Sequence, residues 1–337
     1  MAEPAAGEYA PAVLADLEAM VRAGLGRWGM AADSAITLLN VSENATWRLD
    51  EPRTGRKIVL RVHRVGYHEP DEIRAELAWI QALREEAVVA TPEPLPARDG
   101  ELVQTLASPS GRPARQVVAF AFEEGREPEQ GEDLPRWFEA LGRITGKMHA
   151  HARRWTRPPG FRRKLWDFDA MLGNRPLWGR WQDGMGLDAA SRAHLARVAS
   201  ALRRRLDAFG QGPDRFGLIH ADLRLANLLA QGDRLTVIDF DDCGLSWFAY
   251  DFAAAVSFFE HDPIVPALAE AWAAGYRRSA PFGAEEEAAL PVFVMLRRML
   301  LTAWIASHAE TPLAQEMGVA YTQGTLAMGE GFLARHA

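Results

Sequence analysis

The amino-acid sequence predicts an α+β fold in two parts: an antiparallel five-stranded sheet with one helix, followed by a mainly helical region. Two observations support this. Between residues 36 and 122, short strand-like runs surround a single helical segment. The rest of the chain carries longer stretches whose apolar residues recur three or four positions apart, which is the helical period. We therefore expect a first domain over residues 1–122 and a second over residues 123–337.

Composition excludes several classes of protein. Of the 337 residues, 48% are hydrophobic and 25% charged, as in ordinary globular chains. The net charge of −7 argues against a nucleic-acid partner, since binding to phosphates needs a basic surface. The longest apolar run, Phe293–Ile305, is interrupted by Arg297 and Arg298, so we expect an amphipathic core helix and no membrane partner. The single cysteine, Cys243, cannot form an intrachain disulfide and suits a reducing cytoplasm, while the oligomeric state stays open.

The first part of the chain carries the strand signals. A helix is predicted over Ala10–Ala23. The glycines that follow, Gly24–Gly29, match G-x-G-x-x-G, but a dinucleotide-binding fingerprint follows a strand, so we predict a helix stop. A second helix is expected over Pro70–Glu85, where Ile73 and Leu77 begin an apolar face. The five expected strands are Ile36–Val41, Thr46–Leu49, Ile58–His63, Leu102–Thr105 and Gln116–Phe122.

The second part is expected to be helical around one hairpin. Helices are predicted over Leu134–Arg154 and Ala189–Phe209, separated by an irregular stretch rich in Trp, Pro and Gly. A hairpin is expected over Leu228–Ile238, and the chain from Trp247 onward reads as mainly helical. On the expected helix Leu134–Arg154, His149 and His151 lie two residues apart and point in different directions, so we expect no shared metal site.

The chemistry is concentrated in the hairpin region. His220-x-Asp222-x-x-x-x-Asn227 is followed, after a buried strand, by Asp239-Phe-Asp241. Phosphoryl transfer from a nucleotide needs one carboxylate to orient the attacking hydroxyl, and an amide with a second carboxylate to hold Mg²⁺. We therefore predict Asp222 as the catalytic residue and Asn227 and Asp239 as metal ligands.

These residues resemble a known family. Together with Val237-Ile-Asp-Phe-Asp-Asp-Cys-Gly-Leu-Ser-Trp-Phe-Ala-Tyr-Asp251, they are similar to aminoglycoside-phosphotransferase-type enzymes, with the strongest likeness to the homoserine-kinase and stress-response-kinase branch. The resemblance extends from about Ile36 to the last helices. It implies a bilobal protein-kinase-like fold, ATP or GTP as phosphate donor, and Mg²⁺.

The resemblance also assigns nucleotide-binding residues in the first domain. Arg61 occupies the place of the phosphate-binding strand lysine of kinases, with Lys57 as the alternative. Strand alternation puts the apolar neighbours of Arg61 on the core face and leaves Arg61 to face the nucleotide. Glu76 is its expected partner, and Glu72, one helical turn earlier, is the alternative.

Other assignments follow from the same likeness. The turn that holds Ser42 and Asn44 corresponds to the loop that binds nucleotide phosphates, although it lacks the glycines of protein kinases. The segment 120–125, which includes Phe122, corresponds to the hinge beside the adenine.

Three residues near the motif are expected to assist it. Asp241 departs from the D-F-G pattern of protein kinases, and a carboxylate there is expected to contact metal or acceptor. His220, as a neutral imidazole, is expected to fix the shape of the catalytic loop. Asp251 is expected to cap a helix behind that loop and to support it.

The predicted function is transfer of the γ-phosphate of ATP to a hydroxyl of a small molecule: an amino alcohol, an amino acid or an aminoglycoside-like antibiotic. Acids that include Glu260 and Asp262 could attract a cationic acceptor. The tryptophans at 166, 178 and 181 either form an aromatic wall for it or pack inside the helical region. Two alternatives remain open, a protein Ser/Thr kinase of the bacterial stress-response type and a nucleotide-binding scaffold without transfer. In each case we expect a cytoplasmic protein.

Overall fold

The computed structural model describes residues 10–129 and 133–336, and the chain divides into two compact units. The first unit contains the described residues up to Gly125 together with Arg157–Arg163, and the second contains Arg126–Thr156 and the chain from Lys164 onward. The division into domains at residues 1–122 and 123–337, with the role assigned to each, stays a prediction.

The first unit is built on an antiparallel sheet with the strand order β1-β2-β3-β6-β4, in which β5 also pairs with β6. The sheet therefore has six strands and not the five that we predicted. The additional strand is β4, whose two residues are too few for alternation to be visible in the sequence. The strands are β1 (Ala35–Val41), β2 (Ala45–Asp50), β3 (Lys57–Val62), β4 (Pro94–Leu95), β5 (Val103–Leu106) and β6 (Arg115–Ala121).

One face of this sheet forms the core of the first unit. The side chains of Ile58, Leu60 and Val62 on β3 are buried in it, which confirms the alternation predicted for this strand. Helix α1 (Pro11–Gly24) contributes further apolar side chains, and a short 3₁₀ turn, η1 (Leu25–Trp28), follows it directly. The turn ends at Gly29 in the left-handed region, so the glycines of this segment stop a helix, as predicted.

Helix α2 (Pro70–Glu85) has the bounds that the sequence predicted. Its start is specified locally, because Glu69 and Glu72 form a reciprocal capping box and Pro70 occupies the first turn, where no backbone donor is needed. Burial of Ile73 and Leu77 places its apolar side against the rest of the unit. Glu76, on the same helix, is fully buried, and its carboxylate therefore requires a partner.

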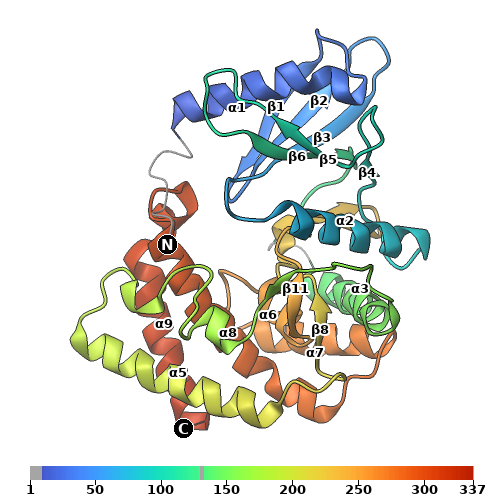
Figure 1. The fold of residues 1–337 in the computed structure, drawn as a ribbon. Helices are drawn as coiled ribbons and strands as arrows, with labels where there is room; N and C mark the ends of the chain where they lie inside the picture. The colour runs from blue at the N-terminus through green and yellow to red at the C-terminus, as the bar shows by residue number, and fades with distance from the viewer. Residues whose placement is uncertain (1–9, 130–132, 337) are drawn as a thin grey trace. The chain divides into compact units, whose positions relative to one another are not determined.

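The second unit is mainly helical (Figure 1). Its helices are α3 (Leu134–Arg154), α4 (Phe168–Met171), η2 (Trp181–Asp183), α5 (Ala189–Phe209), η3 (Leu225–Asn227), α6 (Tyr250–Ala255), α7 (Val265–Arg277), α8 (Ala284–Ser307) and α9 (Pro312–His336), which is kinked at Gly318.

Helices α3 and α7 approach backbone to backbone. A Cβ atom added at Gly142 would lie 1.9 Å from the carbonyl oxygen of Trp272, and one added at Gly275 would lie 1.9 Å from that of Glu139. Glycine is therefore required at both positions for this packing. The close contact fixes α3, which carries His149 toward the catalytic loop described below.

Helix α8 is the central helix of the second unit and packs against α5, α6, α9 and η2. Among the described helices it alone is long and apolar enough to cross a membrane by length and composition, but most of it is buried inside the protein. Arg297 and Arg298 are each only 2% exposed. The amphipathic character that we predicted is therefore wrong, because the two arginines point into the protein toward buried acids.

Short strands deliver the residues of the motif. In one small sheet β11 lies between β7 and β8, and β9 and β10 form the predicted hairpin. Strand β8 ends immediately before His220, and β10 ends two residues before Asp239. The strands are β7 (Lys164–Leu165), β8 (Phe216–Ile219), β9 (Leu228–Gln231), β10 (Arg234–Val237) and β11 (Gly244–Trp247).

Candidate functional site

The loop after β8 brings two of the predicted site residues into contact. The Nδ2 group of Asn227 donates to the backbone oxygen of Asp222 and to its Oδ2 atom, each at 2.8 Å. The backbone N–H of Ile238 donates to the carbonyl oxygen of Asn227 at 3.0 Å, which ties the end of the hairpin to the same loop. Asp222 and Asn227 are thus held together before any ligand is considered.

Two arginines also contact the carboxylate of Asp222. Nη2 of Arg297 donates to Oδ1 at 2.6 Å, and Nε of Arg224 donates to Oδ2 at 3.3 Å. Burial acts to raise the pKa of Asp222, but the positive charges of Arg224 and Arg297 outweigh it and hold the pKa below its ordinary value. Asp222 is therefore an ionised hydrogen-bond acceptor at neutral pH.

Sequence reasoning missed Arg297. It lies 75 residues beyond Asp222 on α8, so no local motif links the two. The signal available in the sequence was a pair of arginines at the centre of an apolar run, which in a core helix requires buried acids as partners.

His220 connects the catalytic loop to the segment that leads to Asp239. Its Nδ1 atom accepts from the backbone N–H of Asp222 at 3.3 Å, so the ring proton is on Nε2, which donates to the carbonyl oxygen of Ile238 at 3.1 Å. The ring also packs against Phe240, with centroids 4.5 Å apart. These are the contacts that a residue needs to fix the shape of the loop.

Asp251 holds the backbone of the same loop from behind. Its Oδ1 accepts from the N–H of Ala221 at 2.7 Å, and its Oδ2 accepts from the N–H of His220 at 3.2 Å. The predicted helix cap is wrong, since Asp251 lies inside α6 and Ala249 occupies the cap position. The carboxylate is used on the catalytic loop instead of on its own helix.

A buried chain of hydrogen bonds extends from Asp251 to α3 and α7. Nε2 of His149 donates to Oδ2 of Asp251 at 2.9 Å, and its Nδ1 accepts from the hydroxyl of Tyr276 at 3.0 Å. All three side chains are fully buried. Burial lowers the pKa of His149 and outweighs the opposing effect of Asp251, so His149 is neutral in the folded protein.

The neutral state of His149 predicts a pH dependence of stability. Below its ordinary pKa of 6.5 the histidine binds a proton in the unfolded chain but not in the folded one, so acid favours unfolding. The free energy of unfolding should therefore fall as the pH drops below this value and should not change through this group above it. We expect thermal unfolding between about pH 8 and about pH 5 to show a smaller acid loss in His149→Gln than in wild type. Equal losses would contradict the assignment.

Two residues of the site have unusual backbone conformations. Ala221 has φ 69° and Asp239 has φ 60°, in the left-handed region that favours glycine. Such conformations cost about 1–2 kcal/mol each for residues with a side chain and persist only where neighbours hold them. For Ala221 the bond to Asp251 provides this support.

The acids after β10 fit a divalent cation. The carboxylate of Asp239 is exposed. Asn227 uses its Nδ2 group for the two bonds to Asp222, so its Oδ1 atom is the one with which Asn227 would bind a metal. Both are hard oxygen ligands of the kind that Mg²⁺ and Ca²⁺ prefer. Asp241 follows in the same loop and is 4% exposed.

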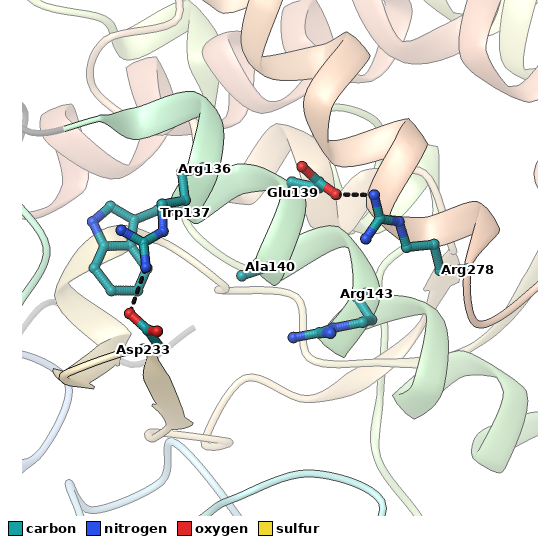
Figure 2. Close-up of a pocket in the computed structure, with 7 residues that line it drawn as sticks. All are labelled: Arg136, Trp137, Glu139, Ala140, Arg143, Asp233 and Arg278. Atoms are coloured by element: carbon teal, nitrogen blue, oxygen red, sulfur yellow. Dashed lines mark hydrogen bonds and ion pairs between the residues drawn. The ribbon is translucent and has the colours of Figure 1, made fainter.

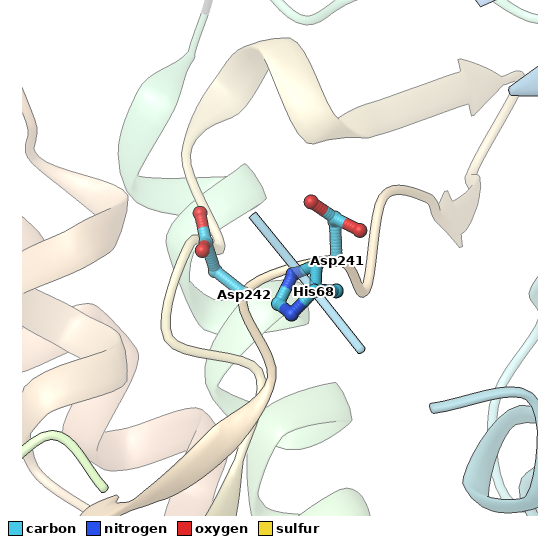
Figure 3. Close-up of side chains that lie close together, drawn as sticks. All are labelled: His68, Asp241 and Asp242. Carbon is cyan, nitrogen blue, oxygen red and sulfur yellow. The ribbon is translucent and has the colours of Figure 1, made fainter. Parts of the chain in front are cut away.

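Figure 3 shows Asp241 and its neighbour Asp242 on this loop, with one carboxylate oxygen of each within 4.8 Å of the other. Nζ of Lys164 lies 3.3 Å from Oδ1 of Asp242 and offsets part of this negative charge. His68, also drawn in Figure 3, belongs to the first unit.

In the first unit, Arg61 pairs with Glu76. Nη2 of Arg61 donates to Oε1 at 2.8 Å and to Oε2 at 2.6 Å. Arg61 is 5% exposed, because α2 places a buried carboxylate against it, and the expected pairing with Glu76 is therefore present. Glu72, the alternative partner, caps α2, and the neighbouring His68, whose Nδ1 lies 3.8 Å from Oε2, lowers the pKa of Glu72 to about 2.

The remaining residues predicted in the first unit lie at strand ends. Asn44 is buried in the turn after β1, and its Oδ1 accepts from the N–H of Arg64 at 3.2 Å. Ser42, in the same turn, donates its backbone N–H to the carbonyl oxygen of Asn44 at 3.0 Å. Phe122 follows β6, with Nζ of Lys57 5.2 Å from its ring centroid. Lys57 also pairs with the exposed Glu124, at 3.0 Å.

The structure corrects one expectation about a cationic acceptor, for Glu260, and decides between the two alternatives for the tryptophans. Glu260 is buried, where it pairs with Arg298 at 2.9 Å and accepts from the hydroxyl of Tyr321 at 2.8 Å. It is therefore not exposed to attract a ligand. The three tryptophans of the irregular segment are also buried, at 1%, 6% and 5% exposure, so they pack in the protein instead of forming an open wall.

A cavity of about 240 Å³ is lined by residues of α3 and the β9–β10 turn and by Arg278, which directly follows α7 (Figure 2). Arg136 pairs there with Asp233, and Arg278 pairs with Glu139, while Arg143 lies between the two pairs. The cavity contains none of the residues that the sequence predicted for the site.

The chain is similar in sequence to known phosphotransferases. Residues 36–290 match the phosphotransferase enzyme family. A homoserine kinase of Sinorhizobium medicae is 31% identical over 264 residues, which covers 74% of this chain and 72% of the relative.

Two solved structures show the same fold. The structure of the microcompartment-associated aminopropanol kinase superposes with a TM-score of 0.87 at 44% identity, covering 94% of this chain and 98% of that one. The structure of the amicoumacin kinase hAmiN in complex with AMP-PNP, Ca²⁺ and Ami superposes with a TM-score of 0.75 at 19% identity, covering 93% of each chain.

These findings confirm the predicted α+β kinase-like fold, apart from the number of strands in the sheet. They also confirm the predicted reaction class, phosphoryl transfer to a hydroxyl of a small molecule, because the chain matches the phosphotransferase family and its relatives are small-molecule kinases. The chain belongs to the phosphotransferase enzyme family and is an ATP-dependent kinase of small molecules.

Proposed function

We propose that this kinase phosphorylates the hydroxyl of a small amino alcohol, with aminopropanol as the first candidate. The observation that carries this choice of acceptor is the 44% identity to the aminopropanol kinase over 94% of the chain. The homoserine kinase relative is less similar, at 31% identity, so an amino acid is the second choice within the same reaction class.

The geometry of Asp222 supports its role as the catalytic residue. Its ionised carboxylate can accept a hydrogen bond from the acceptor hydroxyl and hold it in line for attack. A carboxylate of lowered pKa is a weak base, but in a loose phosphoryl-transfer transition state the hydroxyl proton leaves late, so orientation matters more than early proton removal. Asp222 then takes the hydroxyl proton as the new oxygen–phosphorus bond forms and the bond from the γ-phosphorus to the bridging oxygen breaks, which releases ADP.

We propose that Asn227 and Asp239 hold the cation that accompanies the nucleotide, with Asp241 as a further contact. A Mg²⁺ ion held by these residues would neutralise charge on the phosphates. Asn227 is oriented for this by Asp222, and Asp239 by the hairpin that ends just before it. His220 and Asp251 support both residues through the loop backbone.

We propose that the first unit binds the nucleotide through Arg61, Ser42, Asn44 and the segment around Phe122. Glu76 fixes the guanidinium of Arg61 through two short bonds, so that its remaining N–H groups have defined directions. We propose that the protein is located in the cytoplasm, which supplies ATP and keeps the buried Cys243 reduced.

A panel of acceptors tests the proposal. ADP release would be measured with aminopropanol, ethanolamine, homoserine, an aminoglycoside, and propanol as a matched acceptor without the amine. We expect kcat/KM for aminopropanol to exceed that for homoserine and for propanol by about tenfold or more, since a site built for a polar group discriminates strongly against its absence. A preference for homoserine or for the aminoglycoside would contradict the choice of acceptor but not the reaction class.

A further inference from the structure

We propose that Arg297 is a positioning residue for the transfer, and that Oδ1 of Asp222 is the oxygen that accepts the hydrogen bond of the acceptor hydroxyl. The inference rests on the proposed role of Asp222 and adds the residue that sets its orientation. Arg297 lies outside the sequence motif that contains Asp222, on the central helix α8.

The guanidinium of Arg297 is bound on every nitrogen. Nε donates to the hydroxyl of Ser257 at 2.9 Å, and Nη1 donates to the hydroxyl of Tyr250 at 3.1 Å and to the carbonyl oxygen of Ala221 at 3.4 Å. Nη2 donates to Oδ1 of Asp222 at 2.6 Å. Because the guanidinium is planar, its bonds through Nε and Nη1 also fix the direction of the N–H groups on Nη2, one of which points at Asp222.

Aromatic rings restrict the same group from its faces. The guanidinium carbon lies 5.2 Å from the ring centroid of Trp178 and 5.8 Å from that of Tyr250. With 2% of its surface exposed, Arg297 is also largely removed from water. A desolvated charge of this kind costs free energy unless an acid pairs with it, and Asp222 is the carboxylate in contact with it.

The two oxygens of Asp222 are not equivalent. Oδ2 accepts from Asn227 at 2.8 Å and from Arg224 at 3.3 Å, whereas Oδ1 accepts from Arg297 alone among the described residues. Each carboxylate oxygen has about two acceptor positions. Oδ2 is therefore filled by the chain itself, and Oδ1 keeps one position for the acceptor hydroxyl.

Arg297 also supports the strained peptide before Asp222. Ala221 is held in the left-handed region by Asp251 at its N–H and by Arg297 at its carbonyl oxygen. Loss of Arg297 would remove one of these supports and the donor on Oδ1 together. The predicted consequence is that Asp222 samples other orientations while the nucleotide-binding residues are unaffected.

Arg298 provides a matched control from the same helix. It is equally buried, and in the described part of the chain its guanidinium bonds to Glu260, Tyr321 and Thr325, none of which belongs to the loop after β8. Adjacent residues on a helix point in different directions, which explains why two neighbouring arginines have separate partners. Arg297→Met and Arg298→Met thus remove the same charge from the same helix.

The experiment compares kcat and KM for ATP and acceptor in folded wild type, Arg297→Met, Arg297→Lys and Arg298→Met. We expect Arg297→Met to lower kcat about a hundredfold, with KM for ATP within about twofold of wild type, because misplacement of a positioned group by about 1 Å has such an effect. Arg297→Lys keeps the charge beside Asp222 and should recover part of the loss. Arg298→Met should lower the unfolding temperature but keep kcat.

A double variant separates positioning from general damage. In Asp222→Asn, the further change Arg297→Met should have little additional effect, because there is no carboxylate left to position. A wild-type kcat in Arg297→Met, or the same hundredfold loss in the Asp222→Asn background, would overturn the inference. If Asp222→Asn itself retained full turnover, the proposed function of Asp222 would fail first, so the two failures are distinguishable.

Discussion

Asp222→Asn is expected to lower turnover by several orders of magnitude while ATP binding stays near the wild-type value. The amide has nearly the same shape but less negative charge, and it cannot take the hydroxyl proton when the bond to phosphorus forms. It also places an N–H group among the donors of Asn227, Arg224 and Arg297, which disturbs the orientation of the side chain. Steady-state ADP release and calorimetric ATP titration measure the two effects separately.

Asp188→Asn is a suitable control for this variant. Asp188 is exposed, and its carboxylate accepts from the backbone N–H of Ser191 at 2.8 Å at the start of α5, where asparagine is also a good helix cap. Turnover close to wild type is expected there. Asp222→Asn with undiminished turnover would remove Asp222 from the mechanism, and a parallel loss of ATP binding would show that it has a different role.

Asp239→Ala should abolish most of the metal-dependent binding of ATP. The change removes a carboxylate from the proposed cation site, and a hard divalent cation loses one of its few protein ligands. Alanine at φ 60° adds backbone strain, so Asp239→Asn is the sharper variant, because asparagine tolerates this conformation and keeps a neutral oxygen. We expect the Mg²⁺ concentration needed for half-maximal ATP binding to rise strongly in both variants.

The matching measurement is ATP binding over a range of Mg²⁺ concentrations. Recovery of binding at high Mg²⁺, more complete in Asp239→Asn than in Asp239→Ala, is the pattern expected of a ligand. An unchanged Mg²⁺ requirement in both variants would show that another residue holds the cation.

The parts of the site that lie close together in the chain could be predicted from it. Asp222 and Asn227 share one loop, and the hairpin brings back Asp239, so spacing alone indicated their association. Helix α2 was predicted with its observed bounds because its cap and its apolar period agree. The pairing of Arg61 with Glu76 followed from the family resemblance.

The parts that depend on distant contacts could not be predicted. Arg297 of α8 contacts Asp222, and His149 of α3 contacts Asp251 behind the same loop; no local sequence pattern indicates either contact. Glu260 was misread as a ligand-attracting acid because burial beside Arg298 is a property of the packed helices. The missed strand β4 shows the same limit, since its pairing with β6 is specified by the sheet and not by its two residues.

The central claim is that Asp222 directs the γ-phosphate of ATP to the hydroxyl of a small amino alcohol. An amino alcohol offers both an amine and a hydroxyl, so the product itself is informative. The most direct measurement is ³¹P NMR of the product formed from ATP and aminopropanol by wild type and by Asp222→Asn. We predict a phosphate monoester from wild type and only traces from the variant; a phosphoramidate, no phosphorylated aminopropanol, or equal ester from both proteins would contradict the account.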